Sequence, residues 1–298
     1  MRAKHIVGIG GAHVDWIAKM SIPNVAGAST PGVVDAGVGG CCLNSLRVLA
    51  QLSDVTKITM ISARGADAAG EQVQAAIEEA EIEDQSAVFL DRTTPTYTAV
   101  LDADGDVQAA VADMSLYEDA LPRHLNRREV RDALQHADML VIDANLPAET
   151  IETVTSAFRG IIVGLAISPA KANRLKPSAG NFDLVFMNHR EKAALGDLHA
   201  AGFKDTVITE GTKDVLLSTD GNEYSIGVSQ VPSMVDVTGA GDALAGATLA
   251  ALVKVENCTL YDAVKFGVAA ASKTIQTHGP IASLEWETLL AEVKQHDS

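Results

Sequence analysis

Cysteine is scarce in this chain of 298 residues, which contains only Cys41, Cys42 and Cys258. An odd number of cysteines, two of them adjacent, argues against the disulfide framework of small secreted domains. No cysteine pair with nearby histidines has the spacing of a zinc site. We therefore expect a cytoplasmic protein without disulfides or structural zinc.

Positive charge and long apolar segments are scarce as well. There are 23 lysine and arginine residues against 39 aspartate and glutamate residues, which gives a formal net charge of −16 at pH 7. Because such a surface repels phosphate backbones, we expect no nucleic acid partner, although a small substrate that carries its own Mg²⁺ remains compatible with it. No apolar run reaches the ~18 residues of a membrane span, and the N-terminus lacks the pattern of a signal peptide. We therefore expect no membrane partner.

The sequence does contain short apolar runs that alternate with helical patterns. Continuous apolar character is typical of parallel strands covered on both faces, and the strand–helix rhythm favours a parallel sheet between layers of helices. The predicted strands span residues 6–9, 58–62, 139–143, 161–166, 184–187 and 206–209. The predicted helices span residues 43–52, 68–80, 127–135, 149–158, 191–200, 243–255, 260–277 and 284–294.

Two segments, residues 13–36 and 92–114, interrupt this rhythm. The first is punctuated by glycine and proline, and the second contains two predicted strands, 96–101 and 107–112, around an Asp-Gly pair typical of hairpins. Ligands of open α/β sheets bind at the carboxyl ends of the strands, so a small β lid made from both segments would cover the site and exclude water. The predicted α/β core comprises residues 1–12, 37–91 and 115–298.

The most informative motif is Asp236-Val-Thr-Gly-Ala-Gly-Asp242, which precedes a run of small residues. Gly239, Ala240 and Gly241 have little or no side chain, so their N–H groups can approach an anion at a helix N-terminus. Asp242 follows at once and can take a proton from a hydroxyl group. An anion site beside a carboxylate base suits phosphoryl transfer to an alcohol, although Asp242 could instead cap the helix.

Other polar positions near predicted strand ends suit hydroxyl-rich ligands. Asp15 can accept hydrogen bonds from a vicinal diol, or it can be an exposed turn residue. Gly39 and Gly40 precede a helix with Asn44, whose amide both donates and accepts; the alternative is an ordinary glycine-rich loop. The turn before Asp15 is a near miss for the dinucleotide fingerprint, because His13 occupies its third glycine position, so a dinucleotide oxidoreductase is disfavoured.

Asn188, Glu191, Thr209 and Gly211 follow two further apolar strands. Asn188 and Glu191 share a helical face and could position Mg²⁺ through water, although their spacing is also that of a capping box. Thr209 and Gly211 end a strand where ligands collect, or they form a simple strand-to-turn junction. The sequence has no Gly-x-x-x-x-Gly-Lys-Ser/Thr loop, which excludes ATP binding by a P-loop.

In this order, the motifs resemble those of the ribokinase-like (PfkB) family of carbohydrate and nucleoside kinases. The elements that carry the resemblance are Gly39-Gly40 with Asn44, Asn188-x-x-Glu191, Thr209-x-Gly211 and Asp236-x-Thr238-Gly-Ala-Gly-Asp242. The resemblance spans nearly the whole chain. It implies a ribokinase-like three-layer α/β/α core with a mostly parallel central sheet and a small β-sheet lid.

The resemblance also implies roles for the matched residues. Asp242 would be the catalytic base, and the amides of Gly239, Ala240 and Gly241 would stabilise the transferred phosphoryl group. The acceptor would be bound by Asp15, Gly39, Gly40 and Asn44, with Thr96, Thr98 and Asp113 of the lid reading a base. ATP would be bound by Asn188, Thr209, Gly211, Gly239 and Gly241. Glu191 would hold Mg²⁺ through water, and a monovalent cation, usually K⁺, would bind at Asp236, Thr238, Gly279 and Ser283.

Two segments resemble the pseudouridine kinase branch of this family. They are Ala-Ala-Val-Ala-Asp-Met at residues 109–114 and Ala-Ile-Ser-Pro-Ala-Lys-Ala at residues 166–172. We therefore expect ATP-dependent phosphorylation of the 5′-hydroxyl of pseudouridine. The alternatives are a kinase of ribose, fructose or another nucleoside, and a non-catalytic nucleoside or sugar sensor on the same fold. The resemblance also implies a homodimer formed through the lid.

Overall fold

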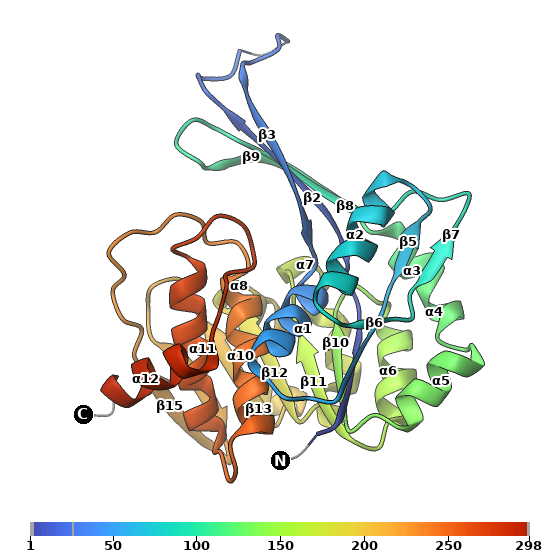
Figure 1. Ribbon diagram of the computed structural model, residues 1–298, viewed down its shortest axis with the longest axis vertical. Helices are drawn as coiled ribbons and strands as arrows, with labels where there is room; N and C mark the ends of the chain where they lie inside the picture. Colours follow the sequence, from blue (N-terminus) through green and yellow to red (C-terminus); the bar gives the residue numbers. More distant parts are fainter. Residues whose placement is uncertain (1–2, 26, 297–298) are drawn as a thin grey trace.

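The computed structural model describes residues 3–25 and 27–296. Residues 1–2 and 297–298 of the predicted core and residue 26 of the predicted lid lie outside this part of the chain. One large sheet lies between two layers of helices, and a second, smaller sheet projects from one edge of this core (Figure 1). The predicted α/β/α architecture with a separate small sheet is therefore confirmed.

The central sheet has nine strands within the described residues, in the order β15-β14-β13-β12-β11-β10-β1-β4-β6. Its strands are β1 (His5–Ile9), β4 (Lys57–Ile61), β6 (Glu83–Asp84), β10 (Met139–Asp143), β11 (Ile161–Leu165), β12 (Leu184–Asn188), β13 (Asp205–Thr209), β14 (Val215–Thr219) and β15 (Asn222–Ile226). Neighbouring strands are parallel except in the β13-β14 and β14-β15 pairs. All six strands predicted from apolar runs are present. The edge hairpin was not predicted, because β15 is largely exposed and has no apolar run.

Helices cover both faces of this sheet because successive side chains of a strand point to opposite sides. Ile6 and Met139 face one hydrophobic core, and Val7 and Leu140 face the other. The helices of the first layer are α1 (Cys41–Leu52), α2 (Ala68–Glu79), α10 (Ala240–Lys254), α11 (Leu260–Thr274) and α12 (Trp286–His296). The second layer contains α3 (Ser115–Asp119), α4 (Leu121–His124), α5 (Arg128–Gln135), α6 (Ala148–Ala157), α7 (Pro169–Ala172), η1 (Asn173–Asn181), α8 (His189–Leu195) and α9 (Leu198–Ala201).

Several helix boundaries differ from the prediction. The single helix predicted over 191–200 is two helices, because Gly196 ends α8 with a positive φ of 78°. The helix predicted over 260–277 ends at Thr274. The short helices α3, α4 and α7 were missed, since four or five residues are too few to show a helical period.

The smaller sheet, which we call the lid sheet, has the strand order β3-β2-β8-β9. Its strands are β2 (His13–Met20), β3 (Gly32–Gly39), β8 (Thr96–Leu101) and β9 (Val107–Asp113). The predicted hairpin is present as β8-β9, and parallel pairing of β2 with β8 joins the two lid segments. Asp15, expected at the end of β1, lies on β2, and β3 continues to Gly39, past the predicted lid boundary at residue 36.

A two-stranded sheet of β5 (Ala63–Gly65) and β7 (Ala87–Phe89) completes the fold. Cys41, Cys42 and Cys258 are free thiols. Among the helices of the described residues, none combines the length and apolar character needed to cross a bilayer.

Candidate active site

The glycine turn before α10 forms one wall of the site. Gly239 is the N-cap of α10 with φ 76°, and a methyl group there would collide with the carbonyl oxygen of Pro280, so the turn requires glycine. Gly241 faces open space, since a Cβ at this position would meet nothing within 4 Å. The Ala240 N–H donates to Val237 O over a long 3.4 Å. The start of this 15-residue helix therefore faces outward with little side-chain cover.

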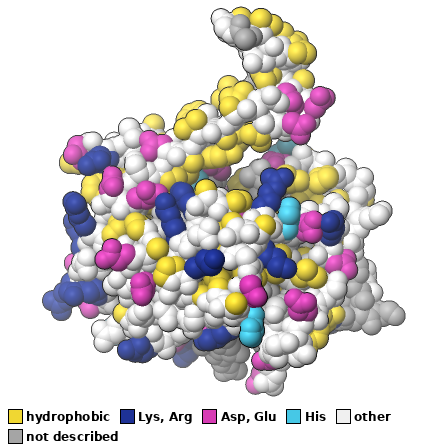
Figure 2. Space-filling model, turned by 180° about the vertical axis from the view of Figure 1, so that it is seen from behind, with side chains coloured by type: hydrophobic (Ala, Val, Ile, Leu, Met, Phe, Trp, Pro, Cys, Tyr) yellow, Lys and Arg dark blue, Asp and Glu magenta, His cyan; other side chains and the backbone are white. Residues whose placement is uncertain are grey.

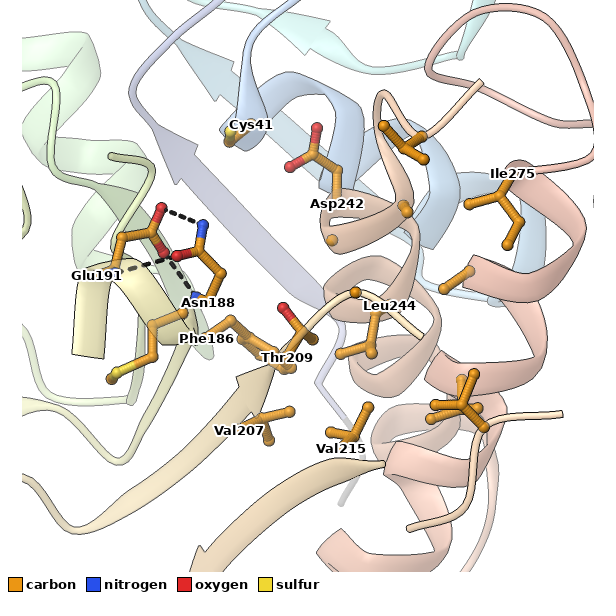
Figure 3. A pocket seen from close by; sticks show the side chains of 18 of the residues that line it. Cys41, Phe186, Asn188, Glu191, Val207, Thr209, Val215, Asp242, Leu244 and Ile275 are labelled. Carbon is orange, nitrogen blue, oxygen red and sulfur yellow. Dashed lines mark hydrogen bonds between the residues drawn. The ribbon is translucent and has the colours of Figure 1, made fainter. Parts of the chain in front are cut away.

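A cavity of about 620 Å³ lies beside this turn (Figure 3). The predicted site residues that line it are Asn188, Glu191, Thr209, Gly211, Ala240, Gly241 and Asp242. The walls farther from Asp242 are apolar and include Phe186, Val207, Val215 and Ile275. This arrangement can hold a flat apolar ring at one end and an anionic group at the helix start.

Asp242 is the third residue of α10 and does not cap the helix, because Gly239 is the N-cap. Its Oδ2 accepts a hydrogen bond of 2.9 Å from Asn44 Nδ2 on α1. Burial raises the pKa of Asp242 to about 6, although hydrogen bonds from Asn44 and Cys41 act in the opposite direction. A carboxyl group with a pKa near neutrality is suited to general base catalysis.

Asn188 and Glu191 lie on the opposite side of the cavity from Asp242 (Figure 3). They form the predicted capping box: Asn188 Oδ1 accepts from Glu191 N at 3.0 Å, and Glu191 Oε2 accepts from Asn188 N at 2.8 Å. Asn188 Nδ2 also donates to Glu191 Oε1 at 2.8 Å. Burial raises the pKa of Glu191, which is 4% exposed.

The same pair offers few ligands for Mg²⁺. Within the described part of the chain, no cluster of three or more His, Cys, Asp or Glu side chains could hold a metal ion. One carboxylate beside an amide oxygen fits Mg²⁺ bound mainly through water and substrate phosphates, because Mg²⁺ dehydrates reluctantly.

The acceptor side of the site contains Asp15, Gly39, Gly40 and Asn44. A methyl group on Gly39 would collide with the Asp15 carboxylate, and one on Gly40, whose φ is 109°, would collide with Gly11 O. Asn44 is 3% exposed, and its buried Oδ1 has no hydrogen-bond partner among the described residues. Because Asn44 also contacts Asp242, the structure brings these predicted residues to the same place.

Three predicted acceptor residues of the lid lie on the other face of the lid sheet from Asp15. Asp15 is paired with Tyr97 across β2 and β8, and directly paired residues point to the same face. Thr96 and Thr98 flank Tyr97 and so point to the opposite face. Asp113 is paired with Thr96, so its side chain points to the same face as that of Thr96. Within one subunit, these three side chains are therefore not brought to Asp15.

The predicted monovalent cation residues are brought together only in part. Asp236 Oδ1 accepts from Thr238 N at 2.9 Å, and Asp236 Oδ2 accepts from Gly279 N at 3.2 Å. Burial opposes the ionisation of Asp236, but these hydrogen bonds outweigh it and lower the pKa. Ser283 is exposed and makes no hydrogen bond to the other three among the described residues.

The sequence reasoning missed a polar cluster between β1 and β10. Asp143, fully buried at the end of β10, accepts from Gly11 N at 2.7 Å, and its pKa is raised by burial. His13, interpreted from sequence as a rim or structural residue, is 7% exposed and places Nε2 3.3 Å from Asp15 Oδ1 and Nδ1 3.3 Å from Tyr117 Oη. The position of Asp143, an acidic residue at the end of an apolar strand, could have indicated this cluster from the sequence.

Known proteins share this sequence pattern and fold. The profile described as pfkB family carbohydrate kinase matches residues 3–287. The chain is 26% identical over 287 residues to the uncharacterized sugar kinase YeiI of Escherichia coli, covering 90% of this chain and 77% of that protein. It is 26% identical over 271 residues to the pseudouridine kinase of Escherichia coli, covering 82% of each. A solved carbohydrate kinase from Agrobacterium tumefaciens is 36% identical, with a TM-score of 0.84 over 98% of this chain and 97% of that chain.

Proposed function

The chain belongs to the pfkB family of carbohydrate kinases, and we propose that it transfers the γ-phosphoryl group of ATP to the 5′-hydroxyl of a nucleoside, preferentially pseudouridine. Kinases of this family use ATP with Mg²⁺ and an alcohol acceptor. The observation that carries the proposal is the position of the Asp242 carboxylate beside the open start of α10. This carboxylate accepts a hydrogen bond from Asn44 on the acceptor side.

Asp242 acts as the general base in this proposal. The 5′-oxygen attacks the γ-phosphorus of ATP, its proton passes to Asp242, and the bond from phosphorus to the β,γ-bridging oxygen breaks to release ADP. The amides of Gly239, Ala240 and Gly241 stabilise the charge on the moving phosphoryl group. The raised pKa of Asp242 makes its carboxylate a stronger base than an exposed aspartate.

The cavity binds the nucleotide. Its apolar walls, which include Phe186 and Val215, suit the adenine ring, and Thr209 and Gly211 lie where the nucleotide passes towards α10. Asn188 and Glu191 would hold Mg²⁺ through water, and the ion supplies charge neutralisation to the phosphates when bound. We place a K⁺ ion at Asp236, Thr238 and Gly279, whose contacts tie the glycine turn to the 279–280 loop.

The acceptor binds between Asp15 and Asn44. A carboxylate can accept two hydrogen bonds from the 2′,3′-diol, and the unpartnered Asn44 Oδ1 can accept one from a further hydroxyl. Holding the diol this way orients the 5′-hydroxyl towards Asp242, and such positioning supplies about 7–11 kcal/mol in favourable systems. Thr96, Thr98 and Asp113 are left out of this binding site within one subunit, because of the register of the lid sheet.

The choice of pseudouridine is supported by the segments at residues 109–114 and 166–172 and by the pseudouridine kinase relative. A sugar kinase is the second candidate, and the 36% identity with a protein described as a carbohydrate kinase favours it.

We also propose that two chains associate through the lid sheet. Trp16, Val34 and Val111 are 38%, 64% and 69% exposed. The register puts all three on the face opposite Asp15, since Trp16 is paired with Thr98, Thr98 with Val111, and Val34 with Ala18, two positions beyond Trp16. Figure 2 shows apolar side chains over much of this projecting sheet. An apolar face of this kind is typical of an interface.

The experiment measures ATP consumption with pseudouridine, uridine, ribose and fructose as acceptors, each with and without K⁺, and with Asp242→Asn as the inactive control. We expect the highest kcat/KM with pseudouridine and stimulation by K⁺. Equal rates on all four acceptors would contradict a specific acceptor. A higher kcat/KM with ribose or fructose would favour the sugar kinase, and acceptor binding without ATP consumption would favour the sensor.

A further inference from the structure

Lys171, on α7, is a partly buried cation that the proposed mechanism does not use. Its Nζ donates to Asn145 Oδ1 over 2.8 Å, and it forms no ion pair with a carboxylate among the described residues. The side chain is partly buried, and burial, followed by the charge of Arg174, lowers its pKa. An ammonium group has three N–H donors, so one hydrogen bond to Asn145 leaves donors for a ligand.

Arg174, on η1, is a second cation close to Asn145, and its contacts are those of a structural residue. Its guanidinium donates to Asn145 O over 2.8 Å and to Glu118 Oε1 over 2.7 Å. Both cations therefore meet the segment after β10, but only Arg174 is neutralised by an acidic side chain. This difference marks Lys171, rather than Arg174, as a candidate for ligand binding.

Asn145 links Lys171 to the turn that leads into the lid. Its Nδ2 donates to Asp143 Oδ2 over 3.2 Å, and the same oxygen accepts from Gly11 N at 2.7 Å. Both ends of the Asn145 amide are thus bound, with the oxygen on Lys171 and the nitrogen on Asp143. Because the amide is fixed at both ends and is 3% exposed, it fixes the position of the ammonium group as well.

The chain of contacts continues to the predicted diol-binding carboxylate. A Cβ on Gly11 would lie 2.8 Å from Asn145 Nδ2 and 3.3 Å from His13 Cε1, so Gly11 is the contact point between these side chains. His13 Nε2 lies 3.3 Å from Asp15 Oδ1. The strands β1, β10 and β11 are adjacent and parallel, so the segments that follow β1 and β11, which lead to Asp15 and to Lys171, leave the central sheet at the same edge.

The backbone before α7 is strained. Ile167 has a φ of 42°, which is an outlier for a β-branched residue, and Ser168 N donates to Ala166 O over 2.6 Å. Residues held in such conformations occur preferentially at functional sites. Here the strained turn directs α7, and with it Lys171, towards the end of β10.

We propose that Lys171 determines acceptor specificity by donating a hydrogen bond to a carbonyl oxygen of a pyrimidine-type base, with Asn145 as its positioning residue. The inference rests on the proposed nucleoside kinase function. A pentose offers hydroxyl groups, for which Asp15 and Asn44 already supply acceptors, whereas a carbonyl oxygen of a base can only accept and needs a donor such as the Lys171 ammonium group. The reacting 5′-hydroxyl faces Asp242, and Lys171 binds the non-reacting end of the acceptor.

The test compares steady-state kinetics of the wild type, Lys171→Met and Lys171→Arg with pseudouridine and with ribose. We expect Lys171→Met to raise the KM for pseudouridine roughly ten- to one-hundredfold, the effect of one charged hydrogen bond, with a smaller change in kcat. Its kcat/KM for ribose should stay within about twofold of the wild type, since ribose has no base carbonyl.

Lys171→Arg should restore part of the affinity for pseudouridine. Lys176→Met, at an exposed lysine on η1, is the matched control and should leave both acceptors unaffected.

The outcomes separate the two proposals. An unchanged KM for pseudouridine in Lys171→Met would overturn the role of Lys171 alone. An equal loss with both acceptors would also overturn it, since that result indicates a structural role. No turnover of pseudouridine by the wild type would overturn the proposed function and the role of Lys171 together. If Lys171→Met fails to fold, Lys171→Gln keeps a donor without the charge, and the shift in melting temperature caused by pseudouridine replaces the kinetic measurement.

Discussion

Asn44 Nδ2 donates to Asp242 Oδ2 over 2.9 Å, although 198 positions separate the two residues in the sequence. The contact arises because α1 and α10 pack against each other, and Asn44 and Asp242 both lie near the start of their helices. It connects the helix of the predicted acceptor site directly to the predicted base. The hydrogen bond lowers the pKa of Asp242, but burial outweighs it.

Replacing the predicted base is the first test of this pair. Asp242→Asn keeps an oxygen that can accept from Asn44 but cannot take a proton. We expect kcat to fall by at least about 10²–10⁴-fold, the range that general base catalysis supplies, with little change in nucleoside binding. Turnover at constant protein concentration and calorimetric binding measure the two effects. Near-wild-type turnover in a preparation free of wild-type enzyme would exclude the base role.

The pKa of Asp242 predicts an acidic limb in the pH profile. The base must be ionised to act, and its pKa is raised to about 6. We therefore expect kcat to fall about tenfold per pH unit below pH 6. Asn44→Asp is the informative comparison, because a second carboxylate beside Asp242 raises its pKa and should move the limb to higher pH. A limb at the same pH in both proteins would contradict the assignment to Asp242.

The same shift has a consequence for stability. An unfolded aspartate has a pKa of about 3.9, so the folded protein keeps a proton on Asp242 over a range where the unfolded chain has lost it. The stabilisation from this group is full below about pH 3.9 and is lost as the pH rises through about 6. Asp242→Asn should therefore gain melting temperature relative to the wild type at pH 8 more than at pH 4.5. A constant difference between the two proteins would show that the pKa is not shifted.

Substitutions of two glycines in the turn before α10 distinguish an effect on folding from an effect on phosphoryl transfer. Gly239→Ala meets a positive φ and a collision with Pro280 O, so it should lower both the melting temperature and the activity. Gly241→Ala has no atom within 4 Å of the new methyl group and should melt like the wild type. Its activity should still fall, since the methyl group stands where the phosphoryl group approaches. Full activity in a stable Gly241→Ala variant would argue against phosphoryl binding at this turn.

The proposed dimer is tested on the lid sheet. Val111→Lys places a charge on the exposed apolar face, where Val111 is 69% exposed, and Val111 does not line the cavity. We expect the molar mass measured by light scattering to fall from that of a dimer to that of a monomer. Val88→Lys, at a 50% exposed valine outside the lid sheet, is the control and should leave the mass unchanged. A wild type of monomer mass at micromolar concentration would contradict the proposal.

The sequence predicts the core of this protein better than its lid. Strands such as Met139–Asp143 are buried on both faces, so they appear as continuous apolar runs. The lid sheet depends on the register between β2 and β8, which are far apart in the chain, and no local pattern gives that register. For this reason the sequence predicts Thr96, Thr98 and Asp113 at the acceptor with Asp15, whereas the residue paired with Asp15 on its face of the lid sheet is Tyr97.

In the candidate site, too, residues of local motifs are predicted from the sequence, whereas contacts between distant segments are not. Asp242, Asn188 and Glu191 belong to compact motifs and are found together around the cavity. Asn145 and Lys171 meet only because neighbouring strands end side by side and a strained turn redirects the chain. Such contacts between loops are a property of the folded chain and leave no spacing to recognise in the sequence.

Two groups of the proposed acceptor, the 2′,3′-diol and the reacting 5′-hydroxyl, face different parts of the molecule. Asp15 belongs to the lid sheet, whereas Asp242 belongs to a core helix. Any tilt of one relative to the other changes the aim of the attacking oxygen, and an error of about 1 Å can cost a hundredfold in rate. The orientation of the lid thus sets the direction in which the acceptor hydroxyl approaches the phosphorus. A more rigid lid keeps this reactive geometry for a larger fraction of the time.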